Sequence, residues 1–107
     1  MNQRNLKIAN NIKELAAQFL GKENNRTSLV TVTSCTTSPD LKQATIFITV
    51  FPETKEKPAL EFIKRKLKEL REFLKKNMPI KIIPFLSVEI DQGEKNRQKI
   101  DELLREK

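Results

Sequence analysis

Four cationic side chains recur along one side of a predicted helix: Lys64, Lys68, Arg71 and Lys75. Their spacing of four, three and four residues places them above one another on an α-helix. Like charges at this spacing repel each other, and a bound polyanion relieves that repulsion. The pattern therefore favours a surface that binds a polyanion, with an ordinary solvated helix face as the alternative.

The whole chain shares this positive charge. Its 107 residues include 21 Lys and Arg against 14 Asp and Glu, which gives a formal net charge of +7. Such a field attracts nucleic acid first and an anionic membrane second, although a basic surface that serves only solubility is an alternative. No apolar run has the length of a membrane span, and the polar start lacks a signal-peptide core. We expect one small domain in a reducing cytoplasm, without a membrane partner.

The residues for most familiar catalytic chemistry are absent. Triad hydrolases need an imidazole, and the chain contains no His, so the single Cys35 is better explained as a small strand residue than as a nucleophile. One Cys without His also leaves too few ligands for zinc. Asp40, Asp91 and Asp101 are scattered and fit turn, strand-end and solvated positions. We therefore expect no enzyme, no metal site and no cofactor.

The cationic stripe needs a helix with an apolar face beside it. We expect this helix to begin at Pro58, to end near Lys76 with Asn77 as its cap, and to stop at Pro79. At 100° per residue, its apolar face collects Leu60, Ile63, Leu67, Leu70 and Leu74. On the opposite flank, packing or a partner contact is expected for two aromatic residues, Phe62 and Phe73.

The remaining elements follow from periodicity and turn residues. An amphipathic helix is predicted from about Asn5 to Leu20, with Gly21 as its C-cap. Two β-patterned runs flank the turn at Pro39-Asp40 and are predicted to pair in antiparallel fashion. The candidate core face of the second run consists of Ala44, Ile46, Ile48 and Val50.

A charged loop is expected over 52–58, and a third strand within 80–90 that carries Pro84 at an edge or a bulge. Asp91 then ends the strand. The order of helix, strand, strand, helix and strand predicts an α+β domain, a three-stranded sheet with helices packed on one face. Residues 93–107 form a charged tail, for which a short helix or partial disorder is expected.

Three stretches resemble the ribosome-binding factor A family. The first is the turn Ser38–Leu41 followed by the period-two strand, the second is the basic, proline-bearing run Met78–Leu86, and the third is Arg97–Leu104. Together they cover most of residues 1–104 in the order of that family. The resemblance implies a type II KH-like fold of order α-β-β-α(-α)-β, with residues 1–92 as the RNA-binding domain and 93–107 as the tail.

The resemblance also implies a function. A member of this family binds free small (30S) ribosomal subunits late in their maturation and assists 16S rRNA processing without being a catalyst. We accordingly expect the chain to be a monomer that contacts rRNA phosphates through the four-residue stripe. Such contacts give affinity and orientation, while specificity comes from rRNA shape. Secondary contacts are predicted for Arg4, Lys7, Lys42, Arg65, Lys66, Lys76 and Lys81.

One departure from the family concerns the second helix. Family members have an Ala-any-Gly kink there, whereas the matching positions in this chain are Lys66, Leu67 and Lys68. We therefore expect a continuous helix. Two other functional classes stay open: a general KH-like module that binds other RNAs, and a protein-interaction adaptor that uses Phe62 and Phe73.

Overall fold

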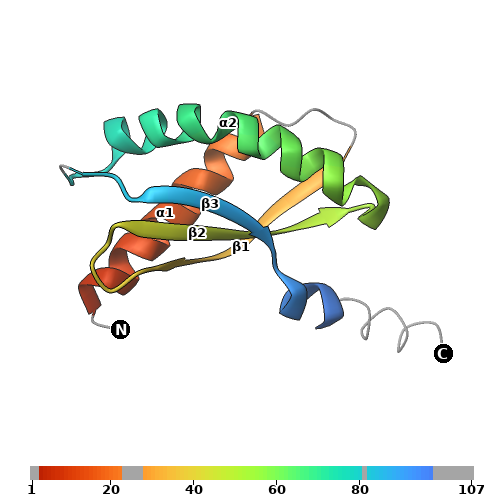
Figure 1. Cartoon of the computed structure of the whole chain (residues 1–107), viewed down its shortest axis with the longest axis horizontal. Helices are drawn as coiled ribbons and strands as arrows, with labels where there is room; N and C mark the ends of the chain where they lie inside the picture. The colour runs from red at the N-terminus through yellow and green to blue at the C-terminus, as the bar shows by residue number, and fades with distance from the viewer. Residues whose placement is uncertain (1–2, 23–27, 81, 98–107) are drawn as a thin grey trace.

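The computed structural model describes residues 3–22, 28–80 and 82–97. Two helices and three strands follow one another in the predicted order (Figure 1). Residues 92–97 add a short helical segment after the last strand. The elements are α1 (Gln3–Lys22), β1 (Leu29–Thr37), β2 (Gln43–Phe51), a 3-10 turn (Glu53–Lys55), α2 (Glu56–Asn77) and β3 (Phe85–Ile90).

The three strands form one mixed sheet in the order β1-β2-β3. The hairpin β1–β2 is antiparallel, as predicted, with an irregularity between Val32 and Ser34. β3 lies parallel to β2, and the connection between them contains α2, because parallel neighbours need a crossover. Both helices pack on one face of the sheet, with α1 crossing behind the strands and α2 running along the β3 side (Figure 1).

The core lies between this sheet face and the helices. Ala44, Ile46, Ile48 and Val50 of β2 are all buried, so the predicted core face is confirmed. The helices contribute their own apolar stripes to the same cluster. In α2, however, Leu60 and Leu67 lie at the margin and are only half-buried. The largest fully buried side chains are Ile12, Ile46, Ile48, Leu70, Leu74 and Pro84.

Two predicted helix boundaries are wrong. Gly21 is not a C-cap, because α1 continues through it to Lys22 and no described glycine has a positive φ. An exposed glycine costs a helix only about 1 kcal/mol, which packing of the apolar face outweighs. The second helix begins at Glu56, before Pro58, and its first turn follows a 3-10 turn over 53–55 rather than a loop. Proline is tolerated there because the first turn leaves N–H groups unused.

The third strand is shorter than predicted. It begins at Phe85, directly after the buried Pro84, instead of running through that residue. Proline has no N–H to donate to a ladder, so the pairing starts where donors resume. The cap predicted at the end of α2 is wrong by one residue, because Asn77 is the last helical residue and Met78 is the C-cap. Asn77 Nδ2 donates to the Phe73 carbonyl at 2.7 Å, and the chain leaves the helix before Pro79, as expected.

Candidate RNA-binding surface

The predicted stripe lies on one unbroken helix. α2 runs from Glu56 to Asn77 without interruption, which confirms the continuous helix expected from the missing Ala-any-Gly motif. All four stripe side chains are exposed. Within the described part of the chain, Lys64, Lys68 and Lys75 form no ion pair. Their charges are therefore available to an external anion.

Arg71 differs from the other three members of the stripe. Its Nη2 donates a hydrogen bond of 3.1 Å to the carbonyl of Ile83, two residues before β3. This bond joins α2 to the segment that leads into the strand. Arg71 thus contributes charge to the surface and also holds the beginning of β3 in place.

A groove of about 410 Å³ lies beside Lys68 and Arg71. Leu67, Lys68 and Arg71 line it from α2, and Phe85 and Leu86 line it from β3. Phe85 is 73% exposed although it is a large aromatic residue. The sequence analysis did not single it out, but its position alternates with buried Leu86 and Val88, which places a phenyl ring on the polar side of the strand.

The secondary cations on α2 have different surroundings. Arg65 and Lys76 are exposed, as a phosphate contact requires. Lys66 is half-buried, pairs with Glu69 at 3.4 Å, and lies 5.8 Å from the centre of the Phe62 ring. It is therefore engaged within the protein more than its neighbours are.

The two aromatic residues of α2 pack inside the domain. The ring of Phe73 lies 5.6 Å from the ring of Phe19 of α1 in a tilted arrangement, and Phe62 is half-buried against the core. Of the two roles expected for them, packing is the one that these contacts show. An adaptor function would need another surface.

Residues far apart in the sequence meet at one end of the sheet. The start of α1, the β1–β2 turn, the end of α2 and the start of β3 all lie at the left of Figure 1. Arg4 and Lys42 line a second groove there, of about 490 Å³, together with Pro84. The N–H of Phe85 donates to the carbonyl of Lys42 at 2.8 Å, so the two grooves flank the same point of β3. We call this region the basic end.

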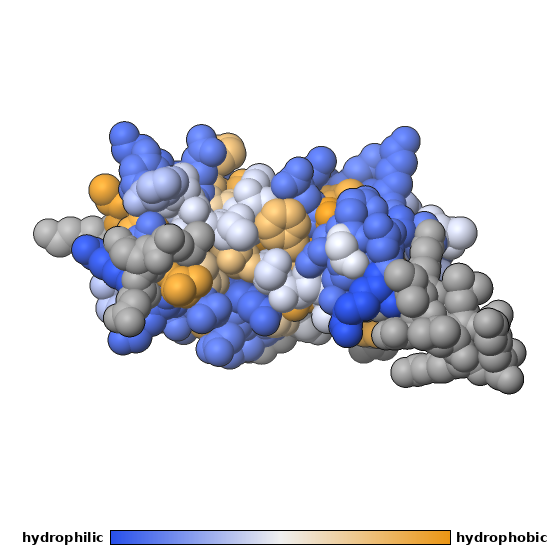
Figure 2. All heavy atoms as spheres, turned by 90° about the horizontal axis from the view of Figure 1, so that it is seen from below, coloured by the Kyte–Doolittle hydropathy of each residue, from blue (hydrophilic) through white to orange (hydrophobic). Residues whose placement is uncertain are grey.

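At the basic end, hydrophobic and hydrophilic side chains lie next to one another, as the left of Figure 2 shows. Lys7 is exposed on α1 and lines a shallow depression with Arg4, Leu6 and Asn10. Lys81 lies outside the described residues. The structure thus brings Arg4 and Lys42 towards the stripe, while Lys7 extends the cationic surface along α1.

The β1–β2 turn is ordered by Asp40. Its carboxylate accepts hydrogen bonds from the Ser38 hydroxyl at 2.7 Å and from the Lys42 N–H at 3.1 Å. These two bonds, the Ser38 bond foremost, lower the pKa of Asp40. Leu41 adopts a left-handed φ of 61°, and its N–H donates to the Ser38 carbonyl. The turn therefore presents Lys42 on a defined backbone.

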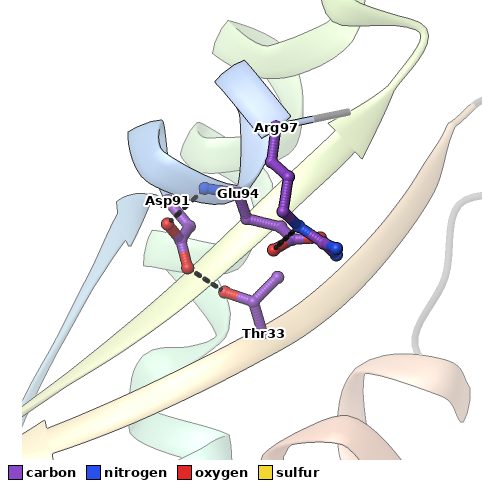
Figure 3. A network of polar contacts seen from close by, with 4 residues as sticks. All are labelled: Thr33, Asp91, Glu94 and Arg97. Carbon is purple, nitrogen blue, oxygen red and sulfur yellow. Dashed lines mark hydrogen bonds and ion pairs between the residues drawn. The ribbon is translucent and has the colours of Figure 1, made fainter. Parts of the chain in front are cut away.

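The opposite end of β3 is closed by a different network (Figure 3). The Asp91 carboxylate accepts a bond of 3.0 Å from the Glu94 N–H and one of 2.6 Å from the Thr33 hydroxyl. The Glu94 bond first, then the Thr33 bond, lowers the pKa of Asp91. Asp91 ends the strand as predicted, but it is also the N-cap of the 92–97 helix, a role that the sequence analysis missed.

Salt bridges complete this closed end. Lys95 Nζ lies 2.8 Å from Glu53 and 3.0 Å from Glu56, and hydrogen bonds to both carboxylates raise its pKa. Arg97 pairs with Glu94 in the same helical segment, as Figure 3 shows. We call the region formed by Thr33, Asp91, Glu94, Lys95 and Arg97 the closed end.

Burial raises the pKa of the Cys35 thiol to about 11, so the thiol is protonated at neutral pH. No helix of the described residues combines the length and the apolar character that crossing a bilayer requires. Each of the three grooves described above is lined by two Lys or Arg side chains.

Comparisons with known proteins decide the family. The sequence model described as Ribosome-binding factor A matches residues 4–104. The chain belongs to the ribosome-binding factor A family. A family member from Paenarthrobacter aurescens is 32% identical over 103 residues, and the match covers 94% of this chain but 62% of that protein. One from Coxiella burnetii is 28% identical over 106 residues, with 97% and 89% covered.

Solved structures confirm the KH-like fold. The crystal structure of ribosome-binding factor A from Thermus thermophilus superimposes with a TM-score of 0.72 at 20% identity, over 80% of this chain and 94% of that one. A putative ribosome-binding factor A from Thermotoga maritima gives 0.68 at 23% identity, over 83% and 90%. Coordinates of the Thermus factor fitted into the cryo-EM map of a 30S complex give 0.67 at 21% identity, over 75% and 87%.

Proposed function

We propose that this chain binds the small ribosomal subunit in the cytoplasm by laying its basic end on the phosphates of 16S rRNA. It acts as a monomer, assists late maturation and rRNA processing, and catalyses no reaction itself. Family membership supports the class of partner, and the Thermus relative was fitted into a 30S complex. The observation that carries the proposal is the row of exposed lysines Lys64, Lys68 and Lys75 on α2, which have no carboxylate partner among the described residues.

A rigid cationic helix suits such a role. α2 is packed on the core through Ile63, Leu70 and Leu74, so its lysines are held at fixed separations. Each phosphate that they neutralise releases counterions from the RNA, which supplies affinity without reading sequence. Arg4 and Lys42 extend the contact around the end of the sheet. Selectivity then comes from the shape of the rRNA that fits both parts of this surface.

The test is co-sedimentation with purified small subunits. The variant carries Lys64→Glu, Lys68→Glu and Lys75→Glu, and leaves out Arg71 because of its hydrogen bond to Ile83. We expect it to stay in the supernatant at concentrations where the native chain pellets, with an unchanged thermal melt. Native-like pelleting of this variant would contradict the proposal.

A matched control separates the basic end from net charge. Lys13, Lys55 and Lys57 lie away from the basic end and, within the described chain, form no ion pair. Reversing these three changes the net charge by the same amount. The control is expected to pellet almost like the native chain. Equal losses in both variants would mean that overall charge alone drives the association.

A further inference from the structure

We propose that residues 98–107 dock on the sheet face opposite α1 and α2, over the side chains of Leu29 and Phe51. We call this sheet face the open face. The docking residues lie outside the described part of the chain. The contact is made by their three apolar side chains, Ile100, Leu103 and Leu104. The inference is independent of the proposed function, because it uses none of the cations at the basic end.

Leu29 and Phe51 form an exposed apolar pair at the edge of the closed end. Leu29 is 61% exposed and Phe51 is 68% exposed. The two residues are partners in the β1–β2 register, so their side chains lie next to each other on one face. Phe51 follows Val50, whose side chain belongs to the core, so this face is the open face. An apolar segment that covers the pair removes both side chains from water, which is favourable.

The chain that follows β3 already lies against the neighbouring part of the open face. Thr49 shares the face of Phe51, since the two residues are two positions apart in β2, yet Thr49 is only 8% exposed. The Asp91 carboxylate accepts a hydrogen bond from the Thr33 hydroxyl of β1. Figure 3 shows the 92–97 helix passing in front of β2 beside this bond. Further chain therefore starts on the side of the sheet where the apolar pair is exposed.

The described chain ends within reach of the pair. Lys95 Nζ lies 2.8 Å from the carboxylate of Glu53, which follows Phe51 by only two residues. The last described residue is Arg97, and ten residues follow it. Ten residues of helix span about 15 Å. This length is enough to cross two neighbouring side chains at the end of the sheet.

The apolar residues of the segment share one helical side. Ile100, Leu103 and Leu104 have the spacing of neighbours on an amphipathic helix. In a helix continued from 92–97, this side is also the side of Arg97, three residues before Ile100. Figure 3 shows the Arg97 side chain extending from the helix towards the strands. The same side of a continued helix therefore presents its apolar residues to the sheet.

Charge and connectivity favour this segment over an outside partner. Residues 98–107 contain three Lys or Arg and three Asp or Glu, so their side chains carry no net charge and are not drawn to a polyanion. A segment joined to its site by a few residues has an effective concentration in the millimolar range. An outside helix has to reach a similar concentration to displace it.

Two matched fluorescent probes test whether the pair is covered. The chain contains no Trp and no Tyr, so one introduced indole reports on one position. Phe51→Trp and Phe85→Trp both lie on the open face, and the native side chains are 68% and 73% exposed in the described structure. We expect Phe51→Trp to emit at the shorter wavelength, because the docked leucines exclude water from its indole. Equal emission maxima would overturn the proposal.

Substitutions in the segment show whether it is the element that covers the probe. Leu103→Glu combined with Leu104→Glu should shift the emission of Phe51→Trp to longer wavelength and leave that of Phe85→Trp unchanged. The control, Lys99→Gln with Lys107→Gln, changes the net charge by the same amount and keeps both leucines. It should shift neither probe. An equal shift from the control, or no shift from the leucine variant, would contradict docking.

Thermal unfolding supplies a second measurement on chains without an indole. The double leucine variant should lower Tm by about 5 °C, the size of shift that loss of one surface contact causes in a small domain. In a Phe51→Thr background the same variant should lower Tm by less, because the contact is already lost. In a Phe85→Thr background the full loss should remain. Equal losses in the two backgrounds would contradict a contact with Phe51.

Other occupants of the open face predict different results. We expect the emission of Phe51→Trp to be independent of protein concentration, with a monomer in analytical ultracentrifugation. A red shift on dilution, together with a dimer, would mean that a second copy covers the pair. A blue shift that appears only after purified small subunits are added would assign the face to a component of the subunit. Either result overturns the proposal, and neither affects the pelleting test of the proposed function.

Discussion

Charged side chains at the two ends of β3 have opposite surroundings. At the basic end, Lys68 and Lys75 face solvent without an ion pair in the described structure, and an exposed ring lies beside them. At the closed end, Lys95 is shared between two carboxylates and Asp91 accepts two hydrogen bonds. One end has its charges available for a partner, and the other uses them to join segments of the chain.

The difference shows why a count of charges does not locate a binding surface. Lysines contribute to the net charge of +7 wherever they lie, yet an internal carboxylate removes Lys95 from the set that a polyanion can use. Arg71 combines both roles, because it contributes charge to the basic end and also donates a hydrogen bond to the backbone carbonyl of Ile83. The expected effects below separate binding from stability at the two ends.

The largest effect concerns the salt dependence of subunit binding. Replacing Lys64, Lys68 and Lys75 by Gln should flatten the slope of log Kobs against log salt by about 2, since each phosphate contact contributes about 0.7–0.9. Affinity at low salt should fall by about 100-fold. Pelleting over a salt series measures both quantities. If Lys95→Gln flattens the slope as much as a single stripe substitution does, the proposed difference between the basic end and the closed end is contradicted.

Stability should respond most at the closed end. Asp91→Ala removes an N-cap and the shorter of the two hydrogen-bond contacts of the Thr33 hydroxyl, which keeps the Phe47 carbonyl at 3.2 Å. We expect a loss of about 2 kcal/mol in the free energy of unfolding, from the usual costs of a cap and of a hydrogen bond to a charged group. Urea titration measures the loss. Affinity for small subunits, compared under conditions where the variant is folded, should remain native.

Arg71 is expected to affect both properties. Arg71→Ala should lower the free energy of unfolding by about 1 kcal/mol, because the bond to Ile83 is lost, and should weaken subunit binding as well. Lys68→Ala should weaken binding alone, since its side chain makes no ion pair within the described residues. Paired denaturation and pelleting measurements on these variants provide the check. Unchanged stability in Arg71→Ala would contradict the role assigned to its hydrogen bond.

The smallest effect appears in acid. The hydrogen bonds to Asp91 lower its pKa in the folded state below the unfolded value of about 3.9. Its ionised form therefore stabilises the fold above that pH, and the contribution is lost as the pH falls through the folded pKa. The stability gap between the native chain and Asp91→Asn should be full at neutral pH and should narrow as the pH falls below the unfolded value of about 3.9. A gap that is constant with pH would contradict this linkage.

Local patterns predicted most of the fold. Period-two spacing identified the buried face of β2, and the helical period identified Ile63, Leu70 and Leu74. Boundaries failed at Gly21 and Pro58, where a single residue was taken as a stop or a start, and at Pro84, through which the third strand was expected to run. Packing of a long apolar face outweighs one unfavourable residue, and proline matters only where a donor is needed.

The functional surface was predictable in part. Lys64, Lys68, Arg71 and Lys75 share one helix, so their common side follows from spacing. Their role in RNA binding stays a prediction, as do those of Arg65, Lys66, Lys76, Arg4, Lys7, Lys42 and Lys81. The division into 1–92 and 93–107 also stays a prediction, although the 92–97 helix crosses that boundary. Phe85 was missed, although its alternation with Leu86 and Val88 places it on the exposed side of β3.

The sequence by itself determined the elements, the sheet face that is buried, the cationic side of α2 and the family resemblance, because these depend on residues close together in the chain. Tertiary structure decided that Lys42 meets the start of β3, that Arg71 holds Ile83, and that Lys95 is neutralised by Glu53 and Glu56. These pairs are joined only by packing of the helices on the sheet. Whether a charged side chain is available to a partner depends on its neighbours in space. These neighbours cannot be deduced from the spacing of residues along the chain.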